Sequence, residues 1–496
     1  MNFPLSSAQE AARLIKDKEV LGIGGFSSVG TPKLVPMALA EYARELHSEG
    51  KEFKVGLITG GAAGSLIDGA LAQADAVFMR TPFQSDKDMR NSINSGKVAY
   101  FDLHLSHIGQ DVRYGFLPKI DVAIIEASDI TAEGEITLST SVGISPTLVQ
   151  QADRVIVELN RVHKGKLKGM HDIFLLDNPP YRKEIPIYRV NDRVGSCTLK
   201  VDPKKIVAVV ESEVKDRIAP FTPLNETTQR IGNNVAAFLL NEWRKGGIPK
   251  EFLPLQSGVG NVANAVLGAL GEDTHLPAFS MFTEVIQNSV IDLMMKGRIS
   301  FATGSSLTLS EDKLDMMYEN LDFFKERVLL RPQEITNHPE MVRRLGIIAV
   351  NTALEADIFG NVNSTHVMGS KMMNGIGGSA DFSRNAFLSI FTTPSTAKDG
   401  LISSIVPQVS HVDSTEHDVR VLVTEQGVAD LRGKSPKERA ACIIENCAHP
   451  DYKELLWDYV KLSEGKGYHT PFSLKNALKM HRAFAETGDM RKTQYE

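Results

Sequence analysis

The stretch EVLGIGGFSSVGTPKLVPMALAEYARELHSEG, residues 19–50, joins an apolar run, a glycine-rich turn and an amphipathic segment. Its first part, 19–26, is apolar on both faces, which is typical of a buried strand in a parallel sheet. Thr31 is a good helix N-cap, and Pro32 suits the first position of a helix. A helix is then predicted by the apolar residues that share one face and by the glycine that follows them, namely Val35, Leu39, Tyr42, Leu46 and Gly50.

The same alternation of strand and helix patterns continues along the N-terminal half. Short runs rich in β-branched residues recur, and segments with a helical period lie between them. Strands are predicted over residues 53–60, 76–83, 98–105, 121–128, 153–160 and 204–212. Because β and α elements alternate, the predicted fold class is α/β with a parallel sheet.

The second half of the sequence repeats this plan. Residues 253–272, LPLQSGVGNVANAVLGALGE, are again an extended run, a glycine-rich turn and a helix pattern. Gly24 and Gly258 lie 234 positions apart, and so do Gly143 and Gly377. Solenoid repeats have periods of about 20–50 residues, so an interval of this length indicates one internal duplication instead.

We therefore expect two similar α/β domains that arose by duplication. The N-terminal domain is predicted at residues 1–225 and the C-terminal domain at 226–496, with the junction in the polar stretch 211–229. Duplicated halves often divide labour, and the C-terminal half contains more of the candidate functional motifs.

Composition excludes several classes of function. The chain has 496 residues, 42% of them hydrophobic, and a net charge of −6, so bulk charge does not indicate a nucleic-acid or membrane partner. Its three cysteines lack CxxC spacing, which argues against a disulfide framework and a zinc site, and no other metal site is expected. The N-terminus lacks a secretory pattern and no apolar run reaches about 18 residues, so we expect a cytoplasmic protein.

Two glycine-rich turns are candidate anion sites. QSGVGN, residues 256–261, opens a predicted helix, where unpaired N–H groups attract negative charge, and NGIGGSADF, residues 374–382, has three glycines in four positions. Either could also be a plain tight turn. Neither is a P-loop or a complete GxGxxG, which disfavours a nicotinamide dehydrogenase. Lys398 follows a strand and is either solvated or a point charge for phosphate.

Glu284, in MFTEVIQNSV (281–290), follows an apolar run, where a glutamate is rare unless it is paired, exposed or used. The pattern after it predicts a helix, so Glu284 is either a carboxylate stabilised by a helix start or a functional group. Glu425 ends another strand pattern, VRVLVTEQG. Ligands bind at the carboxyl ends of parallel strands, which favours function for both glutamates.

A set of motifs runs in order from about residue 20 to 452: GGFSSVGTPK, DVAIIEAS, LPLQSGVGN, TEVIQ, RPQEITN, NSTHVMG, NGIGGSADF, HVDSTEHDVRVLVTEQGVADLRG and NCAHPDY. Together they resemble the acetyl-CoA hydrolase/transferase family of class I CoA-transferases. That family has a two-domain, internally duplicated α/β fold, which agrees with the duplication described above.

The resemblance implies residue roles. It makes Glu284 the nucleophile that attacks an acyl-CoA thioester and ends as a glutamyl-CoA thioester. It places Asn337 beside the nucleophile, makes Glu425 a second active-site glutamate, and makes the N–H groups of Val259 and Gly378 oxyanion donors. It also implies the CoA contacts Gln256, Ser257, Gly258, Val259, Gly260, Asn374, Gly378 and Lys398.

The expected activity is CoA transfer between succinyl-CoA and acetate. Transfer between propionyl-CoA and succinate, and net acetyl-CoA hydrolysis, are the alternatives. A non-catalytic ligand-sensing module is a remote alternative, and it would predict loss of Glu284 or of the glycine turns, which are both present. The resemblance implies acyl-CoA and small carboxylates as partners, a homodimer, and no cofactor beyond coenzyme A.

Overall fold

A computed structural model describes residues 3–218, 224–258, 260–464 and 469–496. The chain forms two compact units. The first comprises Met1–Pro220, Ser280–Leu345 and Asn374–Asp381. The second comprises Phe221–Phe279, Gly346–Met373 and Phe382–Glu496.

These units are not continuous in sequence. Two segments from the predicted C-terminal domain, Ser280–Leu345 and Asn374–Asp381, belong to the compact unit that contains the N-terminal half. The division at residue 225 stays a prediction about the duplicated halves. Both units are mixed α/β, and the described residues form two large mixed sheets, which confirms the predicted fold class.

The first unit is built on a nine-stranded mixed sheet. All seven strands predicted in the N-terminal half are present and pair in parallel, in the order β4-β3-β2-β1-β5-β7-β9. The sequence patterns missed two short antiparallel strands, β6 and β8, which extend from β5. The strands are β1 (Val20–Ile23), β2 (Val55–Thr59), β3 (Val77–Thr81), β4 (Ala99–Tyr100), β5 (Val122–Ile130), β6 (Glu135–Leu138), β7 (Arg154–Asn160), β8 (Leu199–Lys200) and β9 (Ile206–Ser212).

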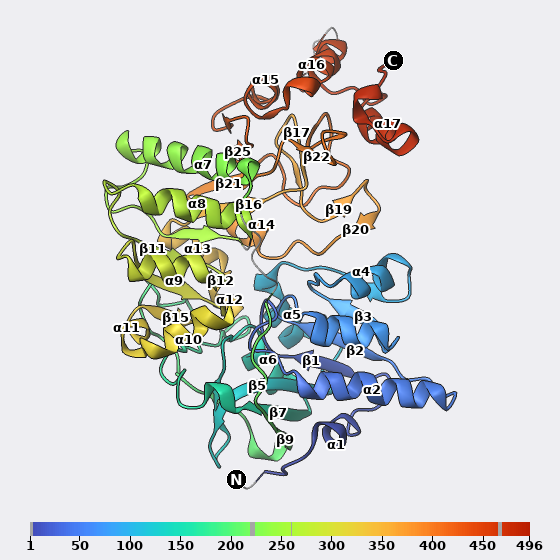
Figure 1. Cartoon of the computed structure of the whole chain (residues 1–496), viewed down its shortest axis with the longest axis vertical. Coiled ribbons are helices and arrows are strands. Elements are labelled where there is room, and N and C mark those ends of the chain that lie inside the picture. Colours follow the sequence, from blue (N-terminus) through green and yellow to red (C-terminus); the bar gives the residue numbers. More distant parts are fainter. Residues whose placement is uncertain (1–2, 219–223, 259, 465–468) are drawn as a thin grey trace. The chain divides into compact units, whose positions relative to one another are not determined.

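Helix α2, Leu34–Ser48, follows β1 and lies along the strands of this sheet (Figure 1). The prediction that Thr31 caps it and Pro32 starts it is wrong, because the helix begins at Leu34. A carboxylate from β7 does the capping: Glu158 accepts hydrogen bonds from the backbone N–H groups of Lys33, Leu34 and Val35 at 2.8–3.2 Å.

The predicted apolar face of α2 is confirmed. Val35 and Leu39 are buried, while Tyr42 and Leu46 pack against the same core. Gly50, with φ +75°, follows the helix end as expected. The other helical elements of this half are α1 (Ala8–Ala12), η1 (Ser65–Gly69), α3 (Ala70–Gln73), α4 (Lys87–Asn94), α5 (Leu105–Tyr114), α6 (Ser145–Gln151), η2 (Arg161–His163) and η3 (Pro203–Lys205).

The segment that follows residue 279 is fastened to the N-terminal half by backbone hydrogen bonds. Val142 N–H donates to the Ser305 carbonyl at 2.9 Å, and Leu307 N–H donates to the Thr140 carbonyl at 2.8 Å. These contacts explain why the segment belongs to the first unit. Its elements are β11 (Phe279–Phe282), β12 (Val285–Gln287), α9 (Asn288–Met295), β13 (Ile299–Gly304), β14 (Ser306–Thr308), α10 (Glu311–Glu319), α11 (Leu321–Lys325), β15 (Val328–Leu330), α12 (Gln333–Thr336) and α13 (Pro339–Leu345).

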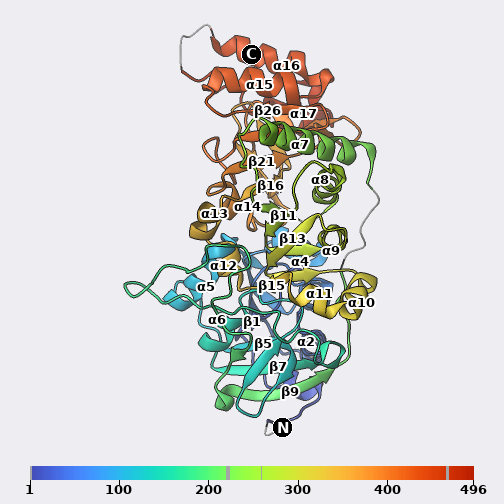
Figure 2. The ribbon, with the colours of Figure 1, turned by 90° about the vertical axis from the view of Figure 1, so that its left-hand side faces the viewer.

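The second unit contains four parallel strands in the order β10-β16-β21-β25, with β26 antiparallel to β25. The predicted strand–turn–helix at 253–272 is confirmed as β10 and α8, and α8 lies beside α7 (Figure 2). Its main elements are α7 (Glu226–Arg244), β10 (Leu255–Ser257), α8 (Asn261–Glu272), β16 (Ile348–Thr352), β21 (Leu388–Thr392), β25 (Val421–Val423), β26 (Val428–Asp430), α15 (Pro436–Cys447), α16 (Pro450–Glu464) and α17 (Lys479–Thr487).

Several short elements complete the C-terminal half: β17 (Glu355–Asp357), β18 (Val362–Asn363), β19 (His366–Val367), β20 (Lys371–Met372), α14 (Ser379–Ser383), β22 (Thr396–Ala397), β23 (Ile402–Ser403), β24 (Ile405–Val406) and η4 (Met490–Lys492). The sequence echo at an interval of 234 residues has a structural counterpart. Gly143 and Gly377 both have positive φ, and each precedes a short helix and then a strand, α6–β7 and α14–β21. In the part of the chain that the structure describes, no helix combines the length and hydropathy that a bilayer crossing needs.

Candidate active site

Glu284 lies at a break between two strands rather than at a helix start. It follows β11 and precedes β12, and α9 begins only at Asn288. The prediction of a helix over the residues that follow Glu284 is therefore wrong at its start, because β12 pairs with β14 in parallel. Glu284 is therefore not a carboxylate stabilised by the dipole of a helix that begins beside it.

The backbone of Glu284 at this break is held by hydrogen bonds from residues at the junction of β13 and β14 of the same chain. The Glu284 carbonyl accepts hydrogen bonds from the N–H groups of Ser305 at 2.7 Å and Ser306 at 3.1 Å. Gly304, which precedes them, lies so close to β12 that an added Cβ would come 2.9 Å from Ile286 Cγ1. A glycine is favoured there for close approach, and the two hydrogen bonds hold the backbone of Glu284.

The Glu284 carboxylate accepts a short hydrogen bond from the side-chain amide of Asn337, as the resemblance implies. Asn337 comes directly after α12, and its Nδ2 also donates to Asp381 Oδ2 at 3.2 Å. Asp381 in turn accepts from the backbone N–H of Ser106 at 3.0 Å and from its hydroxyl at 2.6 Å. The structure thus brings two carboxylates to one amide.

Gly378 lies directly against the Glu284 carboxylate. A Cβ added to Gly378 would come within 1.7 Å of Glu284 Oε1 and 2.5 Å of Asn337 Nδ2. No side chain fits in that space without displacing the glutamate. The NGIGGSADF turn is therefore more than a tight bend, because its backbone contacts a candidate reactive group.

The surroundings of Glu284 disfavour its ionised form. Burial raises the pKa of Glu284 to about 7, the Asn337 hydrogen bond opposes this rise, and the negative charge of Asp381 adds to it. Among the described residues, no Lys, Arg or His forms an ion pair with Glu284. A part-buried carboxylate without a cation partner is typical of a reactive site rather than of a structural ion pair.

The glycine-rich turn also contains Asn374, whose backbone is held by a hydrogen bond. Its carbonyl accepts a hydrogen bond from the Tyr100 hydroxyl at 2.7 Å, and Ile376 N–H donates to Asp102 Oδ2 at 2.9 Å. Within the described residues, the side-chain Oδ1 of Asn374 is buried without a hydrogen-bond partner. An unsatisfied buried acceptor of this kind is a candidate ligand contact.

The other predicted residues belong to the second unit. Gln256 and Ser257 end β10 and are buried, and Gln256 Nε2 donates to Asn351 Oδ1 at 3.4 Å. Gly258 N–H donates to the Val350 carbonyl at 3.3 Å, and Gly260, with φ +119°, is the N-cap of α8. Val259, the predicted oxyanion donor between them, lies outside the described residues.

Glu425 follows β25, at the same edge of the parallel strands as the turn after β10. Its carboxylate accepts hydrogen bonds from Ser395 N–H at 2.9 Å, from the Ser395 hydroxyl, and from Gln426 Nε2 at 2.9 Å. Burial opposes ionisation, but these hydrogen bonds outweigh it and hold the pKa of Glu425 below its usual value. Lys398 is exposed after β22, with its Nζ 4.9 Å from the ring centroid of Phe484.

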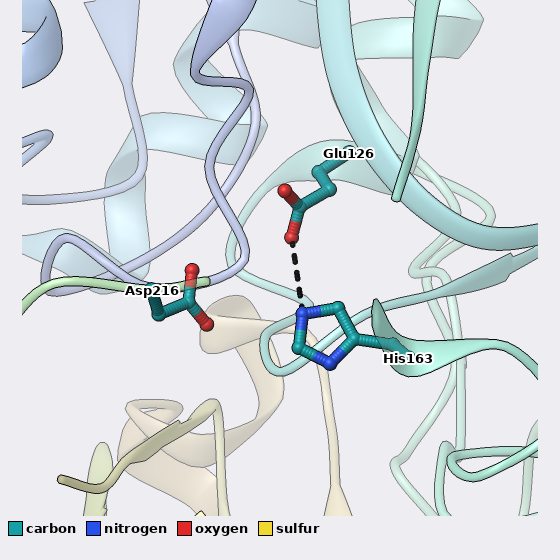
Figure 3. Close-up of side chains that lie close together, drawn as sticks. All are labelled: Glu126, His163 and Asp216. Atoms are coloured by element: carbon teal, nitrogen blue, oxygen red, sulfur yellow. Dashed lines mark ion pairs between the residues drawn. The ribbon is translucent and has the colours of Figure 1, made fainter. Parts of the chain in front are cut away.

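A second buried group of ionisable side chains lies in the first unit. Glu126, His163 and Asp216 point toward one another, with ligand atoms within 4.8 Å (Figure 3). Lys33 already supplies a positive charge there, because its Nζ lies 2.5 Å from Glu126 and 2.9 Å from Asp216. A divalent ion would have to displace that ammonium group, so we assign the cluster to structure.

The fold is shared with solved structures of other proteins. RipA from Yersinia pestis superposes with a TM-score of 0.70 over 93% of this chain and 97% of that chain, at 22% identity. A 4-hydroxybutyrate CoA-transferase from Porphyromonas gingivalis gives a TM-score of 0.62 over 92% and 97% of the two chains, at 21% identity. At such identities the likeness defines a class of fold alone.

Sequence comparison identifies the family. The acetyl-CoA hydrolase/transferase N-terminal domain matches residues 3–211, and the C-terminal domain of the same family matches residues 314–460. A succinyl-CoA:acetate CoA-transferase from Clostridium kluyveri is 50% identical over 98% of this chain and 90% of its own length. A propanoyl-CoA:succinate CoA transferase from Escherichia coli is 48% identical over 98% of both.

An acetyl-CoA hydrolase from Saccharomyces cerevisiae is 43% identical over 99% of this chain and 96% of its own length. The chain belongs to the acetyl-CoA hydrolase/transferase family. It is therefore an enzyme of the CoA-transferase and acetyl-CoA hydrolase type, and this family uses acyl-CoA substrates without an extra cofactor.

Sequence reasoning missed Asp381 and Ser106. Asp381 lies within the quoted motif NGIGGSADF, three residues after Gly378. The sequence showed only that Asp381 follows a glycine-rich turn, and its partner Ser106 in α5 is 275 residues away along the chain. Nothing in a single sequence indicates that pairing.

Proposed function

We propose that the protein transfers CoA between succinyl-CoA and acetate, with Glu284 as the covalent nucleophile. The observation that supports this most directly is the Glu284 carboxylate itself, held by Asn337, in contact with Gly378 and without a cation partner among the described residues. A carboxylate in that setting is poorly stabilised as an anion, and it loses its charge when it is acylated.

The reaction is a series of acyl transfers to and from the Glu284 carboxylate. A Glu284 carboxylate oxygen attacks the thioester carbonyl carbon, the carbon–sulfur bond breaks, and CoA leaves as the thiolate with the electron pair. The thiolate then attacks the glutamyl carbonyl carbon of the resulting anhydride and expels the first acid as its carboxylate. An acceptor carboxylate attacks the glutamyl-CoA thioester, and the same steps in reverse return Glu284 to a carboxylate.

The other predicted residues take supporting roles in this proposal. We infer that the backbone of Gly378, together with Val259 N–H, stabilises the oxyanions that form on the attacked carbonyls. Glu425 is proposed as a second active-site carboxylate. CoA contacts are proposed for Gln256, Ser257, Gly258, Val259, Gly260, Asn374, Gly378 and Lys398.

Covalent labelling of the resting enzyme tests the nucleophile. Incubation with succinyl-CoA without an acceptor should load CoA onto Glu284, and borohydride should then reduce the thioester to an alcohol and inactivate the enzyme. Trypsin separates the two candidate glutamates, because Glu284 lies in the peptide 251–296 and Glu425 in 421–432. A mass change in the second peptide would exchange the two roles, and turnover without any adduct would overturn the mechanism.

A crossed assay separates the substrate pairs. Succinyl-CoA, propionyl-CoA and acetyl-CoA are each combined with acetate, with succinate and with no acceptor, and thioester loss is compared with free thiol release. Transfer conserves the thioester, whereas hydrolysis releases thiol without an acceptor. The relatives at 48% and 43% identity, named as a propanoyl-CoA:succinate transferase and an acetyl-CoA hydrolase, make these the two competing outcomes.

A further inference from the structure

Both polar atoms of the Asn337 side-chain amide form hydrogen bonds. One Nδ2 hydrogen faces Glu284, the other faces Asp381 Oδ2 at 3.2 Å, and Asn337 Oδ1 accepts from the Thr336 hydroxyl at 2.9 Å. An amide rotated by half a turn would point its oxygen at two carboxylates. Asp381 therefore adds a second penalty against that rotation, on top of the loss of the Glu284 contact.

Asp381 is itself fixed at the start of a helix. Ser106 is the second residue of α5, and its N–H and hydroxyl donate to the two oxygens of the Asp381 carboxylate. Only 5% of Asp381 is exposed. A buried carboxylate with donors on both oxygens, at the N-terminus of a ten-residue helix, has little freedom to move.

The two carboxylates that share Asn337 have different fates in the proposed reaction. Glu284 loses its negative charge when it becomes an anhydride or a thioester, and a neutral carbonyl is a weaker acceptor than a carboxylate. Asp381 takes no part in the acyl exchange and keeps its contact with Asn337. The donor therefore stays in place while its partner changes chemical form.

We propose that Asp381, anchored by Ser106, is a positioning residue that holds the Asn337 amide against Glu284 throughout the covalent cycle. This inference rests on the proposed role of Glu284 as nucleophile. Asp381 acts through Asn337 and through its charge, and it does not touch the reacting atoms.

The charges around the pair agree with this role. Burial raises the pKa of Asp381, while Ser106, His104 and Asn337 oppose the rise. The groups that act on Glu284 are the Asn337 amide and the Asp381 charge. A negative Asp381 disfavours the Glu284 carboxylate and ceases to do so once Glu284 is acylated, so it favours the covalent intermediates.

Asp381→Asn tests the role with two readouts. We expect kcat to fall by about 10²-fold with KM for the acyl-CoA nearly unchanged, because the nucleophile is misplaced rather than the substrate site. We also expect the pH midpoint of kcat/KM to move down by about 0.5–1 unit, because a like charge beside Glu284 is removed. Ser106→Ala, which removes one hydrogen bond and no charge, should lower kcat by about 3–10-fold and leave the midpoint in place.

The matched control is Asp357→Asn. Asp357 is also a buried carboxylate held by backbone N–H groups and an asparagine amide, Asn361 Nδ2 at 2.9 Å, but it lies in the second unit. That variant should lose thermal stability without a change in the pH midpoint. If Asp381→Asn does not fold, the kcat and KM of Ser106→Ala test the positioning role in its place.

The outcomes separate this inference from the proposed function. An adduct on Glu284 of the unmodified enzyme, together with unchanged kcat and pH midpoint in both Asp381→Asn and Ser106→Ala, would overturn the positioning role alone. Absence of the adduct during turnover would overturn the nucleophile, and the positioning role with it.

Discussion

Glu126 is buried and Glu284 is part-buried in the first unit, and loss of solvent contact raises the pKa of each carboxyl to about 7. Their partners differ. Glu126 contacts the Lys33 ammonium group and accepts from Ser139 at 2.7 Å and Asn160 at 3.0 Å. Within the described residues, Asn337 is the one hydrogen-bond donor to the Glu284 carboxylate.

The difference teaches what a perturbed pKa indicates. Burial accounts for the shift at both sites, so the shift alone does not separate a structural carboxylate from a reactive one. Both oxygens of Glu126 are engaged, by a cation and two further donors. Glu284 has one donor, partial exposure and a glycine backbone in contact, and these features mark it as the reactive member of the pair.

Removing each carboxylate in turn gives the largest expected contrast. Glu284→Gln keeps the size and the acceptor for Asn337 but removes the nucleophile, and we expect transfer to fall by about 10³-fold or more. Glu126→Gln leaves Lys33 paired with Asp216, so the activity of the folded protein should stay within about threefold. Steady-state transfer rates, normalised to folded protein, measure both. Equal losses in the two variants would contradict the assignment of roles.

The cluster of Lys33, Glu126 and Asp216 should affect the stability of the protein rather than its activity. Lys33 is 2% exposed, and Lys33→Met would leave Glu126 and Asp216 buried without their cation. We expect a loss of about 3–5 kcal/mol in unfolding free energy, with normal activity of the folded fraction. Denaturant melts measure this, with Lys51→Met as control, because Lys51 forms a fully exposed pair with Glu49, and such pairs contribute little to stability. A larger loss in the control would refute the structural role of the cluster.

Gly378 tests the close contact that distinguishes Glu284 from Glu126. Gly378→Ala places a methyl group where the Glu284 carboxylate lies, so the glutamate must move, and we expect kcat to fall by about 10²–10³-fold. Gly268→Ala is the control, since a Cβ there meets nothing within 4 Å and α8 favours alanine. Kinetics and melting temperature are compared for both. A collapse in melting temperature with normal activity of the folded fraction would make the turn purely structural.

The sequence predicted the fold class for physical reasons that are local, whereas most of the candidate site residues came from the family resemblance. Strands β1, β2 and β7 follow from consecutive apolar residues, and the predicted turn at 256–261 follows from its glycines. The start of α2 was mispredicted because its cap is Glu158, which comes from a distant strand. Local rules favour a nearby threonine, and the tertiary partner overrides them.

The setting of Glu284 was beyond the sequence for a similar reason. The residues after it have helical spacing, but β12 forms because it pairs with β14, which is about 20 residues further along the chain. The link from Asn337 through Asp381 to Ser106 joins three separate segments. Single-sequence patterns contain no information on such long-range pairs, so the motif identified the residues and the structure supplied their contacts.

The smallest expected effect is the contribution of Glu284 and Glu425 to the pH dependence of stability. The folded-state pKa of Glu284 lies above its ordinary value, so its favourable contribution is complete below about pH 4.5 and is lost as pH rises through about 7. Glu425 is the opposite case, because its pKa is lowered, and its contribution is present above its ordinary pKa and lost in acid. The two glutamates therefore predict opposite signs for the same substitution.

Glu284→Gln should therefore melt higher than the unmodified protein at pH 8, by the equivalent of about 1–3 kcal/mol, and the gain should shrink at pH 5. Glu425→Gln should melt lower at pH 8, because a neutral amide accepts the hydrogen bonds of Ser395 less well than a carboxylate does. Melting curves of the three proteins at both pH values measure the difference. A loss of stability in Glu284→Gln at pH 8 would mean that Glu284 is stabilised as an anion in the folded protein, as Glu425 is, and the predicted difference between Glu284 and Glu425 would fail.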